Sequence, residues 1–162
     1  MPVREFELFH GVILTKLVRN DRPLTLRLIE TSTELSWAAY KLNAEVTLVM
    51  KSSSTPRALK RESGTAWTFN FGPSDLAQLQ LAGSNGYVAL ACGSKKLDPG
   101  KMEVCFLRPD QVSLLLDTSS SAQQAVTVKA LPRKQLRVSS GRVTKELLVP
   151  QNALETWELP GS

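Results

Sequence analysis

Histidine and cysteine are scarce in this chain of 162 residues. It has one histidine, His10, and two cysteines, Cys92 and Cys105. A zinc site built from these residue types needs three or four ligands, and a Ser-His-acid triad would have to use His10. His10 follows Phe9 in an apolar segment, where we expect a core or interface histidine, and both cysteines lie in apolar runs typical of buried free thiols. We therefore expect no Cys/His metal site, no disulfide and no histidine-based catalysis.

Phosphate-loop, membrane and leader signals are also missing. Residues 83–86 (Gly-Ser-Asn-Gly) have neither the spacing of a P-loop nor the Lys-Ser/Thr that follows one. No run approaches the ~18 apolar residues of a membrane helix. The N-terminus carries Glu5 and Glu7 where a secretory signal has basic residues. These absences favour a cytoplasmic protein without a membrane segment.

Acidic residues are absent between Asp117 and Glu146, in a chain whose formal net charge is +5. Part of this stretch alternates like a strand pair, with valines and Leu136 on one face and Thr127, Lys129 and Arg137 on the other. A two-stranded ribbon with cations on its outer face is suited to contact a polyanion.

The hydrophobic pattern predicts a single α+β domain over residues 1–162, with a mixed or mostly antiparallel sheet, an N-terminal helix and two shorter helices. The expected helices cover residues 3–19, 75–81 with Ser74 as N-cap, and a segment that begins at Pro109 and turns Val112, Leu114, Leu115 and Leu116 inward. The expected strands cover residues 24–30, 37–42, 45–51, 66–71, 87–92 and 102–107. A mobile linker at about residues 118–124 then leads to the basic ribbon at about residues 125–149.

Basic residues gather in three segments that we take as candidate phosphate-binding positions. The first segment is a polar loop that begins at Lys51. The positions expected to bind nucleic acid are Arg57, Lys60 and Arg61 in that loop, Lys95 and Lys96 in a turn, and Lys129, Arg133, Lys134, Arg137 and Arg142 in the ribbon. Arginine forks suit phosphate oxygens. Trp67, Phe69 and Phe71 share one strand face and are expected in the core, which favours backbone contacts over base stacking. Trp37 and Trp157 are expected to be partly exposed, with Trp157 docking on its own core or on a partner subunit.

The order helix, strands, helix, strand resembles the restriction-endonuclease-like core known as PD-(D/E)XK. That resemblance implies a metal-dependent nuclease, in which Glu30, Glu45 and Lys51 would be catalytic and Mg²⁺ would be the cofactor. The chain departs from the family because it has no acid-any-Lys triplet, and its Pro109-Asp110 pair falls at the start of a late helix.

A second resemblance covers roughly residues 6–150. Its residues are the Tyr-Lys-Leu-Asn string at 40–43, the Lys-Ser-Ser-Ser strand exit at 51–54, the aromatic strand at 67–71 and the Ala-Leu-Ala-Cys-Gly string at 89–93. The chain looks like short uncharacterised bacterial proteins, which implies a bacterial source and no particular activity.

The function favoured by the sequence is a small basic module that binds the phosphate backbone of DNA or RNA, without cofactor or chemistry. One alternative is the divergent nuclease with Mg²⁺. Another is a protein-interaction subunit of a bacterial multigene system, or a homodimer, with the first helix or the Trp157 segment as its interface. Whether the three basic segments meet on one face depends on the fold.

Overall fold

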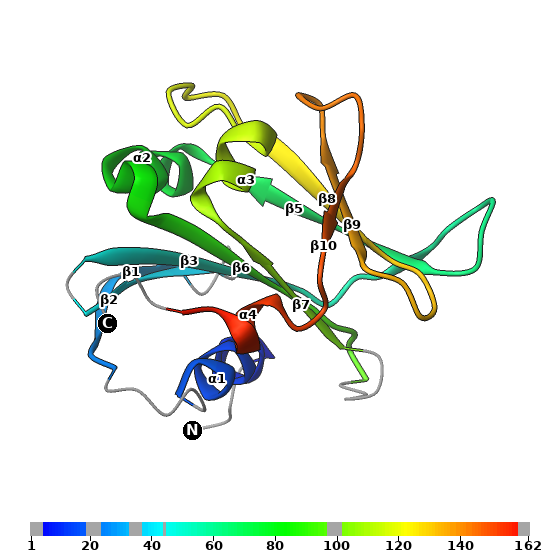
Figure 1. Cartoon of the computed structure of the whole chain (residues 1–162), viewed down its shortest axis with the longest axis horizontal. Coiled ribbons are helices and arrows are strands. Elements are labelled where there is room, and N and C mark those ends of the chain that lie inside the picture. The colour runs from blue at the N-terminus through cyan, green and yellow to red at the C-terminus, as the bar shows by residue number, and fades with distance from the viewer. Residues whose placement is uncertain (1–4, 19–23, 33–36, 44, 97–101, 159–162) are drawn as a thin grey trace.

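The computed structural model describes residues 5–18, 24–32, 37–43, 45–96 and 102–158. Two five-stranded sheets are stacked, with helices between and beside them (Figure 1). The helices are α1 (Glu5–Val18), α2 (Pro73–Ala82), α3 (Pro109–Leu115) and α4 (Ala153–Thr156), and a 3-10 turn, η1 (Gly83–Asn85), follows α2. The strands are β1 (Leu26–Ser32), β2 (Trp37–Leu42), β3 (Val46–Ser53), β4 (Arg57–Ala58), β5 (Thr65–Phe71), β6 (Gly86–Cys92), β7 (Glu103–Leu107), β8 (Gln124–Ala130), β9 (Leu136–Ser140) and β10 (Leu147–Val149). The expected α+β class with mostly antiparallel pairing is confirmed.

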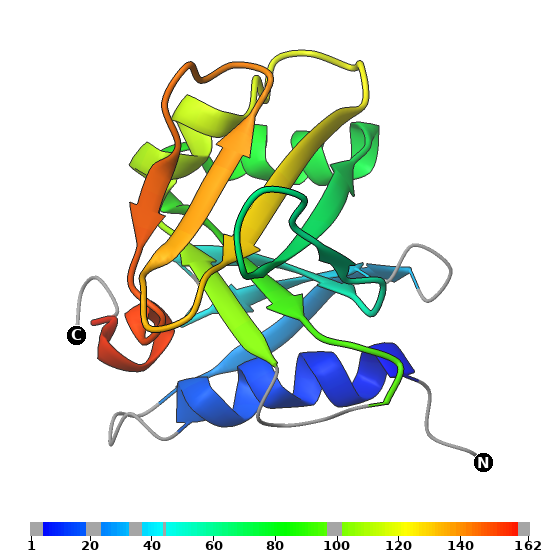
Figure 2. The same ribbon diagram turned by 90° about the vertical axis from the view of Figure 1, so that its right-hand side faces the viewer.

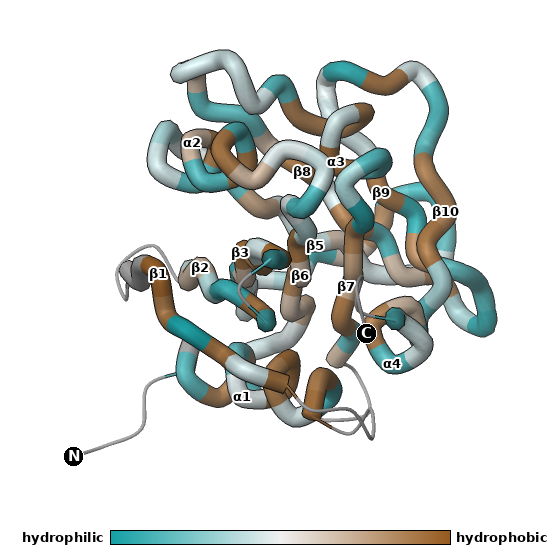
Figure 3. The backbone as a smooth tube through the Cα atoms, turned by 60° about the vertical axis from the view of Figure 1, so that its left-hand side comes forward, coloured by the Kyte–Doolittle hydropathy of each residue, from teal (hydrophilic) through white to brown (hydrophobic). Residues whose placement is uncertain are grey.

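The first sheet has the strand order β1-β2-β3-β6-β7. Its strands pair antiparallel except β3 and β6, which run parallel because β4, β5 and α2 intervene between them. All of β6 is buried, since both faces of this sheet are covered. Figure 3 shows the apolar character of β6 and β7, which lie inside the molecule. Cys92 and Cys105 are free and buried on these neighbouring strands, as expected.

The second sheet has the strand order β10-β9-β8-β5-β4 and is antiparallel throughout (Figure 2). Its inner face carries Trp67, Phe69 and Phe71 together with the valines of β8 and β9. These side chains form one core with Val49 and Leu90 of the first sheet and with the apolar faces of α2 and α3. The opposite face carries polar residues such as Thr68 and Asn70, together with the exposed Leu148 of β10.

A second core lies between the other face of the first sheet and the helices α1 and α4. Phe9 and Ile13 of α1 are buried there, and His10 is buried as well. Trp157, directly after α4, packs its ring 4.6 Å from Tyr87 and 4.8 Å from Phe106, measured between ring centroids. Of the two sequence alternatives for Trp157, the side chain therefore docks on its own core. No described helix is long and apolar enough to cross a membrane.

Local details correct the sequence expectations at several points. Helix α2 begins one residue before Ser74: its N-cap is Gly72, whose N–H donates to a carboxylate oxygen of Asp75, so Ser74 is not the cap. Leu114 is 54% exposed because it points away from the face of α3 that holds Val112 and Leu115. Trp37 is 2% exposed and belongs to the core between the sheets. The polar loop after β3 contains the two-residue strand β4, which the sequence pattern did not predict.

Gly93 follows β6 where helix α1 crosses the sheet, and its hydrogen leaves room for Phe9. A Cβ at this position would lie 2.3 Å from Cε1 of the buried Phe9 ring. We expect Gly93→Ala to lower the free energy of unfolding by about 1–3 kcal/mol, because overpacking displaces a ring that cannot move into solvent. Denaturant unfolding followed by circular dichroism measures this.

Gly11 of α1 provides the matched control, since a Cβ there would have nothing within 4 Å. Gly11→Ala should raise the free energy of unfolding by up to about 1 kcal/mol, because alanine favours the helix. If Gly93→Ala left the free energy of unfolding unchanged or raised it, the packing of Phe9 against Gly93 would be contradicted.

Candidate nucleic-acid interface

The outer face of the second sheet carries its cations in one row across the strands. The register places Arg57 of β4 opposite Ala66, Ala66 opposite Lys129, and Lys129 opposite Arg137. Thr127 pairs with Thr68 and with Ser139 in the neighbouring row. The apolar partners of these residues on β8 and β9 are fully buried, as the alternation predicts. This face therefore carries small polar side chains and one row with three cations, and the exposed Leu148 of β10 lies next to Arg137 at the end of that row.

The cations of β8 and β9 are already paired with acids. Lys129 Nζ lies 3.0 Å from a carboxylate oxygen of Glu146, and Arg137 lies 3.7 Å from Glu62. Arg142, in the turn after β9, lies 4.0 Å from Asp117. These partners reduce the positive potential of the predicted ribbon. Half-buried or exposed pairs of this kind are worth at most about 1 kcal/mol each, so a stronger anion can displace them.

One end of the molecule brings three other basic segments together. They are the β4–β5 hairpin, the loop after β6 and the β8–β9 turn, on the right of Figure 1 and toward the viewer in Figure 2. Their residues line one cavity of about 530 Å³, with Pro56 and Ser63 from the hairpin, Ser94 from the loop and Pro132 from the turn. We call the seven cations of these segments the basic rim: Arg57, Lys60, Arg61, Lys95, Lys96, Arg133 and Lys134.

Every side chain of the basic rim is exposed, and no ion pair within the described part of the chain involves one of them. A close backbone contact fixes the hairpin against the turn. A Cβ on Gly64 would lie 2.7 Å from the carbonyl oxygen of Ala130, so only glycine fits there. Among the described acids, Glu62 of the hairpin forms an ion pair with Arg137, and Glu103 lines the cavity. The rim therefore has a surplus of positive charge.

Arg133 holds a backbone conformation that arginine rarely adopts. Its φ is +59°, in the left-handed region, at the exposed tip of the β8–β9 turn. Glycine or asparagine occupies this region with less strain. The strained backbone of this exposed arginine makes Arg133 a candidate functional position.

Two of the three predicted catalytic residues, Glu45 and Lys51, lie at opposite ends of β3. Glu45 precedes β3 and Lys51 lies near its other end, six residues on, which separates them by roughly 20 Å along the strand. The side chain of Glu30 lies outside the described part of the chain, and its backbone in β1 pairs with Ala39 of β2. Nowhere in the described ranges do three or more His, Cys, Asp or Glu side chains group to hold a metal ion.

Lys51 also lies apart from the basic rim, because its side chain is buried. Its ammonium bonds a carboxylate oxygen of Asp75 at 2.8 Å. Asp75 is a residue that sequence reasoning missed. The signal that could have identified it is the Gly-Pro-Ser-Asp string at 72–75, which places an acid at the third helical position, where it can cap the helix.

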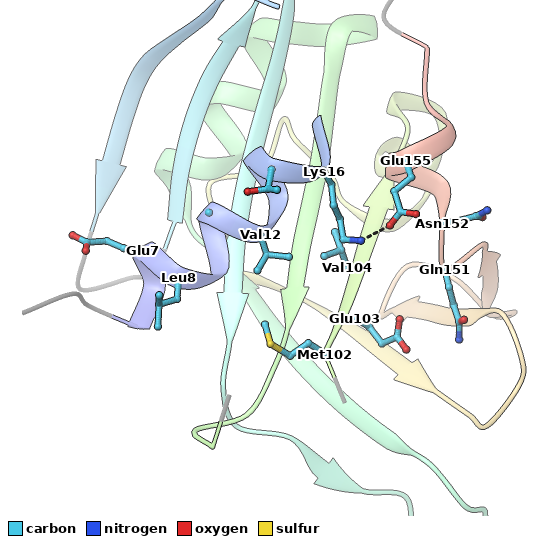
Figure 4. A pocket seen from close by; sticks show the side chains of 12 residues that line it. Glu7, Leu8, Val12, Lys16, Met102, Glu103, Val104, Gln151, Asn152 and Glu155 are labelled. Carbon is cyan, nitrogen blue, oxygen red and sulfur yellow. Dashed lines mark hydrogen bonds and ion pairs between the residues drawn. The ribbon is translucent and has the colours of Figure 1, made fainter. Parts of the chain in front are cut away.

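A groove of about 740 Å³ lies between α1, α4 and the start of β7 (Figure 4). Its walls carry Leu8 and Val12 of α1 and Met102 and Val104 beside them, and an ion pair between Lys16 and Glu155 joins α1 to α4. Burial raises the pKa of Glu103 at the groove wall, and Lys16 opposes that rise. The ionisable residues among its lining are Lys16, Glu7, Glu103 and Glu155.

No protein-family model matches this chain, and neither a curated protein nor a solved structure matches it.

Proposed function

We propose that this protein is a binding module that contacts the phosphate backbone of a nucleic acid through the basic rim. The observation that carries the proposal is the convergence of three basic segments, distant in sequence, around one cavity at one end of the second sheet. Cations grouped on one surface bind polyanions because each phosphate contact releases condensed counterions.

The chemistry of the rim favours contact with the backbone. Its arginines can donate two parallel hydrogen bonds to a phosphate, and its lysines add point charges. Trp67 and the other rings of β5 face the core, so this sheet offers no stacking platform for bases. The small side chains of Thr68, Thr127 and Ser139 let a strand approach the sheet closely. Binding of this kind has little dependence on sequence.

The proposal is tested by removing rim charge without disturbing the core. We expect the triple variant Arg57→Gln, Arg61→Gln, Arg133→Gln to bind a labelled DNA or RNA duplex at least about tenfold more weakly at low salt. The slope of log K against log salt should fall by about 2–3, because up to three phosphate contacts are lost. Fluorescence anisotropy titrations at about 50 and about 200 mM salt measure both quantities.

The matched control changes the same net charge elsewhere. Arg27, Arg108 and Lys145 are exposed and lie outside the rim; Arg27→Gln, Arg108→Gln, Lys145→Gln should bind much like the wild type. Equal losses in the two triple variants would reduce the effect to net charge and overturn the rim as a site. No salt-dependent binding by the wild type would overturn the function itself.

A single substitution separates binding from folding at the rim. Arg133→Gly should leave the free energy of unfolding unchanged or raise it by up to about 1 kcal/mol, because glycine accepts the positive φ without strain. The same substitution should still weaken duplex binding, since it removes one guanidinium group that can donate hydrogen bonds to a phosphate. Probe cleavage in the presence of Mg²⁺ or Mn²⁺, in any of these titrations, would instead favour the nuclease alternative.

A further inference from the structure

The buried ion pair of Lys51 and Asp75 lies where the two sheets and helix α2 meet. Lys51 is 5% exposed and Asp75 is 3% exposed, and their charged atoms are 2.8 Å apart. The ammonium also lies 5.1 Å from the ring centroid of Phe71 and 6.0 Å from that of Trp37. Removing two charges from water is unfavourable unless their remaining hydrogen-bonding capacity is used. The pair is therefore a candidate ligand-binding position.

Part of that capacity is not used by the protein. Oδ2 of Asp75 accepts from the Lys51 ammonium and, at 2.9 Å, from the N–H of Gly72. Oδ1 of Asp75 is buried and accepts no hydrogen bond from any residue that the structure describes. The ammonium has three N–H groups, of which one bonds the carboxylate. An unused acceptor, Oδ1 of Asp75, thus lies beside the N–H donors of the Lys51 ammonium.

A cavity of about 510 Å³ adjoins this pair, a size within the range of small-ligand sites. It lies beside Thr68, Phe69 and Asn70 of β5. Strand β4 pairs only with Thr65 and Ala66 of β5 and does not reach these residues. Hydroxyl and amide side chains form most of its remaining polar lining: Ser52, Ser53, Thr68, Asn70, Ser74 and Gln123. Each of these groups can both donate and accept a hydrogen bond.

The lining selects the class of ligand. The two charges compensate each other, which disfavours an ion and favours a neutral molecule. Trp37 and Phe69 also line the cavity, but both rings pack into the core between the sheets and the Lys51 ammonium lies over the ring of Trp37, so neither ring is presented for stacking on a base. Hydroxyl groups suit the site because one hydroxyl can donate to a carboxylate oxygen while it accepts from an ammonium.

We infer that this cavity binds a small neutral polyhydroxylated ligand, a sugar unit whose neighbouring hydroxyls engage Asp75 and Lys51. The inference rests on these two residues and their surroundings, and it does not depend on the basic rim. Such a sugar has two sources, a free monosaccharide or the ribose at the 3′ end of an RNA strand, which has adjacent 2′- and 3′-hydroxyls.

The test is a titration of the full chain, followed by amide NMR shifts, with D-ribose, D-glucose, a short RNA and the same RNA lacking its terminal 3′-hydroxyl. We expect saturable shifts at Ser52, Ser53 and Ser74, which line the cavity and do not belong to the outer face of the second sheet. Binding by the free sugars would identify a monosaccharide site. Binding only by the RNA with the intact end would identify the ribose source. Shifts that are absent, or that lie outside the cavity, with every probe would overturn the inference.

Variants connect the shifts to the pair. Lys51→Met, Asp75→Leu together should abolish binding. Asn70→Ala, at an exposed lining position that does not support the core, should weaken binding by about five- to tenfold. The rim variant Arg57→Gln, Arg61→Gln, Arg133→Gln should bind the free sugars as tightly as the wild type does. Unchanged sugar affinity in Asn70→Ala and in the double variant would also overturn the site.

Discussion

Replacing Lys51 with methionine should lower the free energy of unfolding by about 3–5 kcal/mol, because it leaves the carboxylate of Asp75 buried without its counter-charge. Methionine matches the length of the lysine stem and packs against Phe71 and Trp37, so loss of volume contributes little. A loss of this size is a large fraction of the 5–15 kcal/mol that typically stabilises a domain.

The double variant Lys51→Met, Asp75→Leu should recover most of that loss, since no uncompensated charge remains. Urea unfolding of the wild type, both single variants and the double variant gives the coupling energy of the pair. Lys60→Met is the control, because Lys60 is exposed and its replacement should change stability by less than about 0.5 kcal/mol. A loss in Lys51→Met no larger than that of the control would show that the pair is solvated.

The pair was not predictable from the sequence because its partners are 24 residues apart and belong to different elements. Lys51 ends an apolar strand and is followed by serines, so the pattern assigns it to a solvated basic loop. Only the position of β3 between β2 and β6, with α2 packed against β3, removes Lys51 from water. The mistake about Ser74 is local by contrast, since the capping acid Asp75 lies one residue further along.

Local patterns did predict most of the elements. The strand at residues 37–42 matches β2, and the strict alternation of Trp67, Phe69 and Phe71 correctly places their rings in the core. Alternation works here because the period of a strand directly separates a buried face from a solvated one. It cannot reveal β4, where two exposed residues form a strand only because β5 lies beside them.

Convergence of the basic segments is a property of the sheet order. Residues 57–61 and 133–134 are far apart in the chain, yet β5 pairs with β8 so that Thr65 lies opposite Ala130 and the two turns meet. The contact of Gly64 with the Ala130 carbonyl shows how close they come. Of the cations chosen from the sequence, Lys129, Arg137 and Arg142 have acidic partners, which no local pattern indicates.

Raising the pH from about 8 to about 10.5 should destabilise the protein through its two thiols. Burial raises the pKa of Cys105 to about 12, and burial, together with the neighbouring Cys105 and Glu103, raises the pKa of Cys92 well above its usual value. In the unfolded chain both thiols ionise near pH 9, so above that pH the native state binds more protons and unfolding becomes easier. At pH 10.5 Cys105 alone should cost about 2 kcal/mol, from a slope of about 1.4 kcal/mol per pH unit.

The variant Cys92→Ala, Cys105→Ala isolates this effect, because lysine and tyrosine titration is common to both proteins. Chemical unfolding at several pH values from about 8 to about 10.5 should show the wild type losing stability faster than the variant as pH rises, by at least about 2 kcal/mol over the range. A thiol reagent at pH 8 gives an independent measure: both cysteines should react only through unfolding, so added denaturant should accelerate labelling in step with the unfolded fraction. Parallel pH profiles for the two proteins, or rapid labelling of the native state, would mean that β6 and β7 are open to solvent and that the core between the sheets is not closed.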